Sequence, residues 1–134
     1  MKIFILLSLC TCALSLKLNK DTIEQWTAMC RPYEEKCIKQ SGVQKELADS
    51  KYTNLDYPDD PAFKCYMDCL VRALGFIDSN NKCARDTIMK TAKGVHSDLL
   101  DACIEKAEKS SQPCEAGYIL AHCGISGTAK LQNS

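Results

Sequence analysis

Cysteine is the residue that most restricts how this chain can fold. The sequence holds ten cysteines in 134 residues, far above the ordinary usage of a globular protein. Disulfides form in oxidising compartments, and they stabilise domains whose hydrophobic core is small. Because a chain of this length has room for one domain, we expect a single exported domain that is held together by disulfides.

The N-terminal segment has the features of a secretory signal peptide. Lys2 supplies the positive charge, and an apolar run that is too short to span a bilayer follows it and ends in small residues. We therefore predict that residues 1–15 are a signal peptide and that residues 16–134 form the mature protein. This protein is expected to be secreted, extracellular and without stable membrane insertion. Cys10 and Cys12 leave with the signal, so an even number of cysteines remains.

The mature chain has the periodicity of an all-α protein. Apolar residues recur at helical spacing along most of it, and strand-like alternation is absent. We predict about six helices, with a kink or break at Pro32 in the first and a surface loop over 51–60. The tail at 125–134 is too poor in apolar residues for a helical plug, and we expect a lid, a wall or a disordered surface segment there. The predicted helices cover 21–39, 43–49, 61–74, 84–92, 97–109 and 113–123.

The third predicted helix should be buried nearly all round. Its strongly polar interior residues, Lys64, Asp68 and Arg72, are four apart and form one narrow stripe. Cys65 and Cys69 are also four apart, which places their Cβ atoms roughly 5 to 6 Å from each other, whereas a disulfide needs about 3.5 to 4.5 Å. These two cysteines must therefore pair with cysteines elsewhere in the chain.

The cysteine spacing resembles that of a known family. Three residues separate Cys65 from Cys69, and eight separate Cys114 from Cys123. With the sequence around the third helix, this spacing resembles the insect odorant-binding protein family of pheromone and general odorant binders, over essentially the whole mature chain. The segments around the third helix that share the resemblance are 63–70 and 74–78.

The resemblance implies a fold and a disulfide framework. It implies six helices that enclose an apolar pocket, held by three or four disulfides. Cys30 and Cys83 are additional to the six-cysteine pattern, and we expect a fourth bridge between them; the alternative is that they stay free or pair between molecules. The three bridges implied by the resemblance are Cys37 with Cys69, Cys65 with Cys114, and Cys103 with Cys123.

The resemblance also implies a function. It predicts a non-enzymatic carrier that binds small hydrophobic molecules, such as odorants or pheromones, and transports them through aqueous fluid to a chemosensory receptor, as a monomer or weak homodimer. Tyr118 and His122 could present polar tips to a ligand oxygen. For every candidate, ordinary core packing is the alternative. The expected ligand-binding residues are Trp26, Met29, Leu70, Leu74, Phe76, Ile77, Met89, Leu100, Ile104, Tyr118, Ile119 and His122.

Other function classes have little support in the sequence. A formal net charge of zero disfavours nucleic acid as a partner. We expect no catalytic residues, since no Gly-x-Ser-x-Gly motif occurs and paired cysteines leave no thiolate nucleophile. Neither a C-x2-C pair nor a histidine pair at zinc-ligand spacing is present, so neither metal nor cofactor is expected. The rival interpretation is a disulfide-stapled secreted interaction module, either saposin-like and membrane-active or receptor-binding.

Overall fold

The computed structural model describes residues 15–134. The predicted signal peptide, apart from its last residue, and Cys10 and Cys12 lie outside these residues. The described chain is all-α: it contains six helices and, apart from an isolated bridge between Ile77 and Cys83, no strand pairing. The helices are α1 Lys20–Ser41, α2 Lys45–Asp49, α3 Pro61–Ala73, α4 Arg85–Thr91, α5 Ser97–Glu108 and α6 Glu115–Gln132.

Local signals set the ends of α3. The Asp60 side chain accepts a hydrogen bond from the Phe63 N–H at 3.0 Å, and Pro61, which has no N–H to satisfy, occupies the first helical position. After the helix, Gly75 adopts a φ of 76°, a left-handed conformation that glycine tolerates without steric cost. The helix therefore begins and ends where its sequence predicts.

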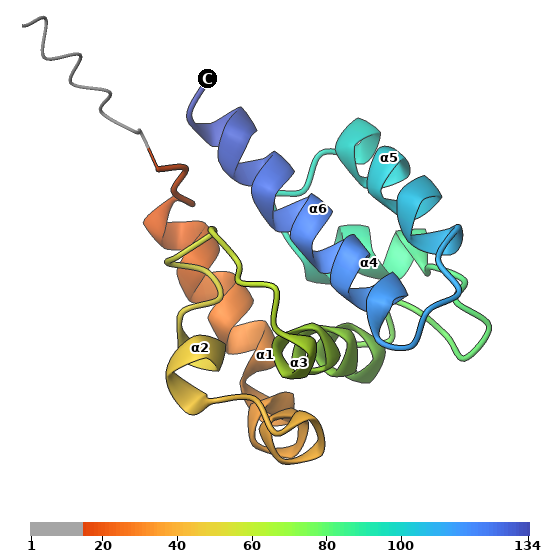
Figure 1. Ribbon diagram of the computed structural model, residues 1–134. Coiled ribbons are helices and arrows are strands. Elements are labelled where there is room, and N and C mark those ends of the chain that lie inside the picture. The colour runs from red at the N-terminus through yellow and green to blue at the C-terminus, as the bar shows by residue number, and fades with distance from the viewer. Residues whose placement is uncertain (1–14) are drawn as a thin grey trace, which may run out of the picture.

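Helix α1 is continuous through Pro32. Of the two outcomes expected at Pro32, a kink or a break, the structure has the kink: Figure 1 shows that the two halves of α1 run in different directions. The buried side chains of α1 include Trp26, Cys30 and Cys37, which recur at helical spacing along one face. Burial of this face compensates for the backbone hydrogen bond that Pro32 removes.

Helix α6 is much longer than expected. The sequence prediction ended it before Gly124, but the helix continues to Gln132, so the expectation of a non-helical tail is wrong. Ile125, Thr128 and Ala129 are buried in this extension. Its last turn lies against the start of the described chain, where Gln132 Oε1 accepts a hydrogen bond from the Asn19 N–H at 2.7 Å. Tertiary packing thus holds the extension of α6, which its two glycines, Gly124 and Gly127, disfavour.

Three disulfides connect the long helices. Cys37–Cys69 joins α1 to α3, Cys65–Cys114 joins α3 to the start of α6, and Cys103–Cys123 joins α5 to α6. They are the three pairs that the family resemblance implies. In Figure 1, α6 crosses the molecule between α5 and α1, with α3 beneath them and α4 behind.

The expected fourth bridge between Cys30 and Cys83 is not formed, and both thiols are free. Cys30 lies in the core cluster of α1 and α3, where its Sγ is 3.1 Å from the Tyr52 hydroxyl. Cys83 packs against a second cluster, formed with α4, α5 and α6, and its N–H donates to Glu108 Oε2 at 2.9 Å. The expectation fails because the two cysteines belong to different clusters.

Candidate ligand-binding cavity

An apolar cavity lies between the two core clusters. The empty space among its lining atoms is about 570 Å³, which includes solvent at the open side of the cavity. The centre of a water molecule can occupy about 70 Å³. Aliphatic, sulfur-containing and aromatic side chains dominate the lining, with no lysine, arginine or carboxylate among the residues that form it. The cavity can therefore accept apolar molecules, and it offers no counter-charge to an ion.

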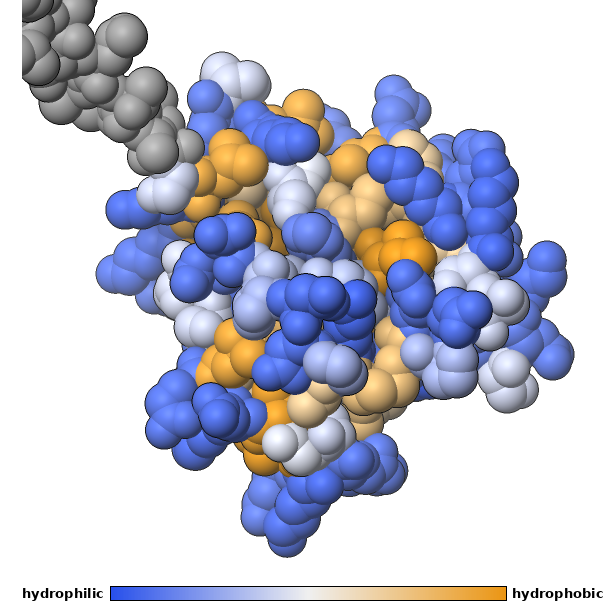
Figure 2. All heavy atoms as spheres, in the orientation of Figure 1, coloured by the Kyte–Doolittle hydropathy of each residue, from blue (hydrophilic) through white to orange (hydrophobic). Residues whose placement is uncertain are grey.

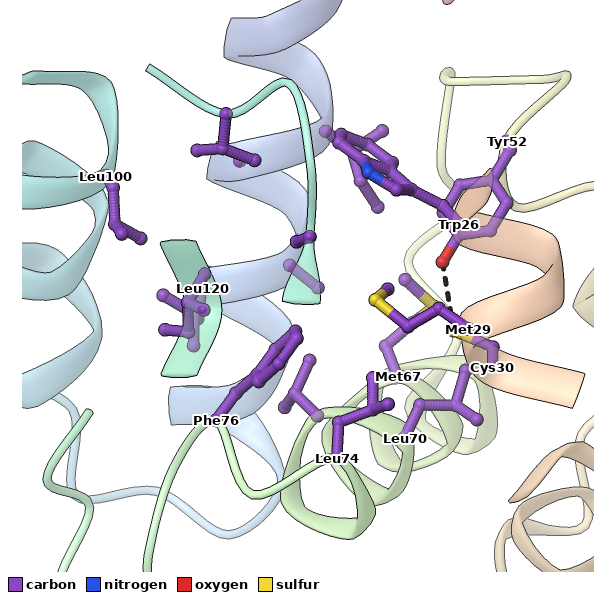
Figure 3. Close-up of a pocket in the computed structure, with 17 residues that line it drawn as sticks. Trp26, Met29, Cys30, Tyr52, Met67, Leu70, Leu74, Phe76, Leu100 and Leu120 are labelled. Carbon is purple, nitrogen blue, oxygen red and sulfur yellow. Dashed lines mark hydrogen bonds between the residues drawn. The ribbon is translucent and has the colours of Figure 1, made fainter. Parts of the chain in front are cut away.

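Six of the twelve residues expected from the sequence line this cavity. They come from α1, α3, the turn after α3 and α5, so four segments of the chain converge on one space. Figure 3 shows Phe76, Leu100 and Leu120 on one side of the cavity, opposite Trp26 and Tyr52. The six are Trp26, Met29, Leu70, Leu74, Phe76 and Leu100.

Six expected residues do not line the cavity. Ile77 is buried in the second core cluster. On α6, Tyr118 and His122 stack on Tyr57, at ring-centroid distances of 6.3 and 5.0 Å, away from the cavity. Their i, i+4 spacing identified a shared face of α6 but not what the face contacts. The remaining three, which pack around the second cluster, are Met89, Ile104 and Ile119.

The sequence prediction missed the polar end of the cavity. The segment 51–60 was expected to be a surface loop, but Lys51 and Tyr52 are buried, with relative exposures of 3% and 6%. Lys51 Nζ lies 2.7 Å from Glu34 Oε1 on α1 and 5.1 Å from the centroid of the Tyr52 ring. No periodic signal marks a loop residue that is buried by a distant ion pair, because this contact depends on the tertiary fold.

Eleven lining residues were missed by the sequence prediction, and two of them could have been found from the sequence alone. Met67 and Val71 lie on the helix that was predicted to be buried nearly all round, so their proximity to a core cavity follows from that prediction. Gly124 and Ile125 line the cavity because α6 extends further than expected. The other residues missed are Cys30, Tyr52, Ile88, Ala92, Val95, Leu120 and Ala121.

Burial keeps the titratable groups of the cavity neutral. Desolvation raises the pKa of the Cys30 thiol, and it holds the pKa of Tyr52 well above its ordinary range. The Cys30 sulfur and the Tyr52 hydroxyl form one hydrogen bond, and Trp26 Nε1 donates to the Lys93 carbonyl at 3.0 Å. The polar atoms of the lining side chains are therefore uncharged and partnered.

Comparison with known proteins identifies the family. The profile of the PBP/GOBP family matches residues 19–126, which is most of the described chain. The chain belongs to the PBP/GOBP family. General odorant-binding protein 99a of Drosophila melanogaster is 30% identical over 110 residues, which cover 76% of this chain and 77% of that protein. General odorant-binding protein 69a of the same species is 26% identical over 123 residues, or 86% of this chain and 76% of that protein.

A solved structure supports the PBP/GOBP fold. Odorant-binding protein dmelOBP28a from Drosophila melanogaster matches with a TM-score of 0.57 and 20% identity, covering 84% of this chain and 98% of that one. The family match extends from just before α1 into the second half of α6, so it includes every helix that lines the cavity.

Two further observations describe this PBP/GOBP chain. Within residues 15–134, no helix is both long enough and apolar enough to cross a bilayer. Over the same residues, no group of three or more histidine, cysteine, aspartate or glutamate side chains is placed to hold a metal ion.

Proposed function

We propose that this protein is a secreted, non-enzymatic carrier that binds small hydrophobic molecules and transports them through aqueous extracellular fluid. The observation that carries the proposal is the apolar cavity, which helices joined by three disulfides surround. Membership of the PBP/GOBP family and relatives named as odorant-binding proteins support it. Delivery to a chemosensory receptor, by a monomer or weak homodimer, belongs to the same proposal.

The energetics of the cavity are consistent with a carrier. Each buried CH₂ group of a ligand contributes about 0.8 kcal/mol, and the loss of ligand freedom offsets part of that sum. Ten buried CH₂ groups contribute about 8 kcal/mol before that cost is subtracted, so the net affinity of a ten-carbon chain should be weaker than micromolar, which corresponds to about −8 kcal/mol. The disulfides matter because an internal cavity weakens a fold by about 24 cal/mol per Å³, while closing a loop of about 30 residues contributes roughly 3 to 4 kcal/mol.

The surface favours a carrier over a membrane-active module. Among residues 15–134, Leu131 is the single large hydrophobic side chain that is exposed, at 47%. Figure 2 shows a face on which hydrophilic residues predominate and hydrophobic ones are scattered. A module that acts by inserting into lipid needs a contiguous exposed apolar surface.

A variant that fills the cavity tests the proposal. Gly124 lines the cavity, and nothing lies within 4 Å of the position that a Cβ would occupy there. We expect Gly124→Leu to weaken binding of a fluorescent apolar probe by about 10-fold or more, because the new side chain takes the space of the ligand. Lys106→Leu, at an exposed position of α5, is the matched control and should bind like the wild type.

The binding assay uses protein secreted from the full chain and purified from the medium. Native mass spectrometry with volatile alcohols, esters, aldehydes and fatty acids measures one-to-one complexes directly. If the folded protein forms none, the carrier proposal fails. Binding that requires lipid vesicles would support the membrane-active module in its place.

A further inference from the structure

The cavity has two chemically different ends. At one end, the Tyr52 hydroxyl lies 3.1 Å from the Cys30 sulfur, as the dashed line in Figure 3 shows. At the other end, Phe76, Leu100 and Leu120 present only carbon. A ligand in this cavity therefore meets hydrogen-bonding groups at one end and none at the other.

The packing around Tyr52 fixes the direction of its hydroxyl. Its ring makes an edge contact with the Trp26 ring, with the two centroids 5.8 Å apart and the planes at 64°. Behind it, Lys51 lies over the ring and is held by the ion pair with Glu34. Because these contacts bury the ring, its hydroxyl is already held toward Cys30, and a ligand that binds it does not have to order a free side chain.

The present partner of the Tyr52 hydroxyl is a weak one. A thiol is a weak hydrogen-bond donor and a weak acceptor, whereas a carbonyl, ester or alcohol oxygen is a good acceptor for the Tyr52 hydroxyl. The Tyr52 hydroxyl therefore gains free energy when it exchanges Cys30 for a ligand oxygen as its hydrogen-bond partner. The Cys30 thiol loses a partner in this exchange, at a small desolvation cost. The indole N–H of Trp26 is not available for this exchange, because it already donates to the Lys93 carbonyl.

The same end disfavours an anion. No lysine or arginine lines the cavity, and the nearby Lys51 is neutralised by Glu34 at 2.7 Å. Burial raises the pKa of Cys30 and of Tyr52, and it would oppose a ligand carboxylate for the same reason. The oxygen that suits this end is therefore uncharged.

We infer that the preferred ligands of this protein are apolar molecules with one neutral oxygen acceptor at one end, such as a ketone, ester or alcohol, which accepts a hydrogen bond from the Tyr52 hydroxyl. The inference rests on the proposed carrier function and names the ligand class of the same cavity. It assigns the polar contact to Tyr52, which the sequence prediction missed, in place of Tyr118 and His122, which lie outside the cavity.

Two volatile ligands of similar size test the assignment. Methyl hexyl ketone has one acceptor oxygen, and n-nonane has none. The depletion of each vapour above a solution of the secreted protein gives the two affinities by headspace gas chromatography. Tyr52→Phe should weaken ketone binding by about 3- to 10-fold, the range expected for one neutral hydrogen bond, and change nonane binding by less than about 2-fold.

Tyr118→Phe is the matched control, because it removes a tyrosine hydroxyl that does not line the cavity, and it should change neither affinity. Cys30→Ala gives a second test that does not alter Tyr52: without the competing sulfur, the preference for the ketone over nonane should rise by about 2-fold or more. Thermal unfolding followed by circular dichroism checks that each variant is folded.

Several results would overturn the inference. An equal loss of ketone and nonane binding in Tyr52→Phe would overturn it, as would a selective loss in Tyr118→Phe or a lower ketone preference in Cys30→Ala. Tighter binding of nonanoate than of the ketone at neutral pH would overturn the neutral ligand class. In these cases the carrier function stands. Wild-type protein that binds neither volatile would also overturn the inference, and only failure to bind every alcohol, ester, aldehyde and fatty acid of the panel would remove the proposed function with it.

Discussion

The carboxylate of Asp68, in the middle of α3, accepts a hydrogen bond from the backbone N–H of Gly117, in the first turn of α6, at 2.9 Å. The residue that precedes α6, Cys114, provides no side-chain cap, so a side chain from another helix satisfies this N–H. The second Asp68 oxygen accepts from Arg72 Nε, also at 2.9 Å. A buried carboxylate thus fixes where α6 begins relative to α3.

The close approach of α3 and α6 requires glycine at position 117. A Cβ there would lie 2.4 Å from Asp68 Oδ1 and 2.7 Å from the Asp68 Cα. We expect Gly117→Ala to lower the free energy of unfolding by about 2 to 3 kcal/mol, through overpacking and loss of the cap, as measured by urea denaturation. Gly124→Ala is the matched control on the same helix, and it should raise stability by about 0.5 to 1 kcal/mol. Equal effects of the two variants would contradict this account of Gly117.

The ion pair between Lys51 and Glu34 should support the wall of the cavity. The Lys51 side chain is only 3% exposed, so neutralising Glu34 leaves a buried charge without an ionic partner. We expect Glu34→Gln to cost about 2 kcal/mol, less than for a fully buried pair because Glu34 is itself 25% exposed. Glu35→Gln is the control, since Glu35 is 89% exposed and its pair with Lys39 is long, at 3.8 Å. A similar melting temperature for both variants would mean that the buried pair does not stabilise the fold.

The two free thiols should react slowly in the native protein. Burial raises the pKa of Cys30, and burial together with Glu108 and Asp78 raises the pKa of Cys83 to about 11. At pH 8 we expect iodoacetamide to label Cys83 slowly and Cys30 more slowly still. After unfolding without a reductant, both should be labelled, as peptide mapping would show. Absence of label on both in the unfolded chain would indicate the Cys30–Cys83 bridge that the structure lacks.

Protonation of His122 should destabilise the protein. Its ring stacks on Tyr57 and Tyr118, and desolvation, with a smaller effect of Lys130, lowers its pKa below 6.5. The His122 imidazole of the unfolded chain therefore binds a proton more readily than that of the folded protein. The contribution of neutral His122 to stability is complete above its unfolded-state pKa, and it is lost as pH falls through its folded-state pKa. The melting temperature should therefore fall less in His122→Gln than in the wild type between about pH 6.5 and pH 5.

His96→Gln is the control for this experiment, because His96 is exposed at the start of α5. It should retain the wild-type dependence on pH. Titration of the ring protons by NMR measures the His122 pKa directly, and a value above that of an unfolded peptide would contradict the expected direction.

The parts of the fold that could be predicted have local causes. The limits of α3 follow from Asp60, Pro61 and Gly75, and its burial follows from its narrow polar stripe. The spacing of the cysteines was enough to suggest the family and, through it, the disulfide pairs that the structure contains. These signals act over a few residues or are fixed by covalent geometry, so the sequence displays them directly.

The parts that could not be predicted depend on long-range packing. The sequence prediction ended the last helix before Gly124, but α6 continues, and a Cβ at Gly127 within the extension would be 2.3 Å from Leu99 Cδ1. These glycines serve close packing and an open cavity rather than helix termination. Tyr52 was missed for a similar reason: its loop has a polar composition, and only the ion pair between Lys51 and α1 shows that it turns inward.

The three disulfides also divide the wall of the cavity into fixed and movable parts. They tie together α1, α3, α5 and α6, whereas within residues 15–134 no bridge reaches the segment 42–60 or α4. Segments without covalent ties open locally at lower free energy than the whole fold. Entry and departure of a guest should therefore proceed through brief excursions of the segment 42–60 or of α4, and the Lys51–Glu34 ion pair should slow the first of these.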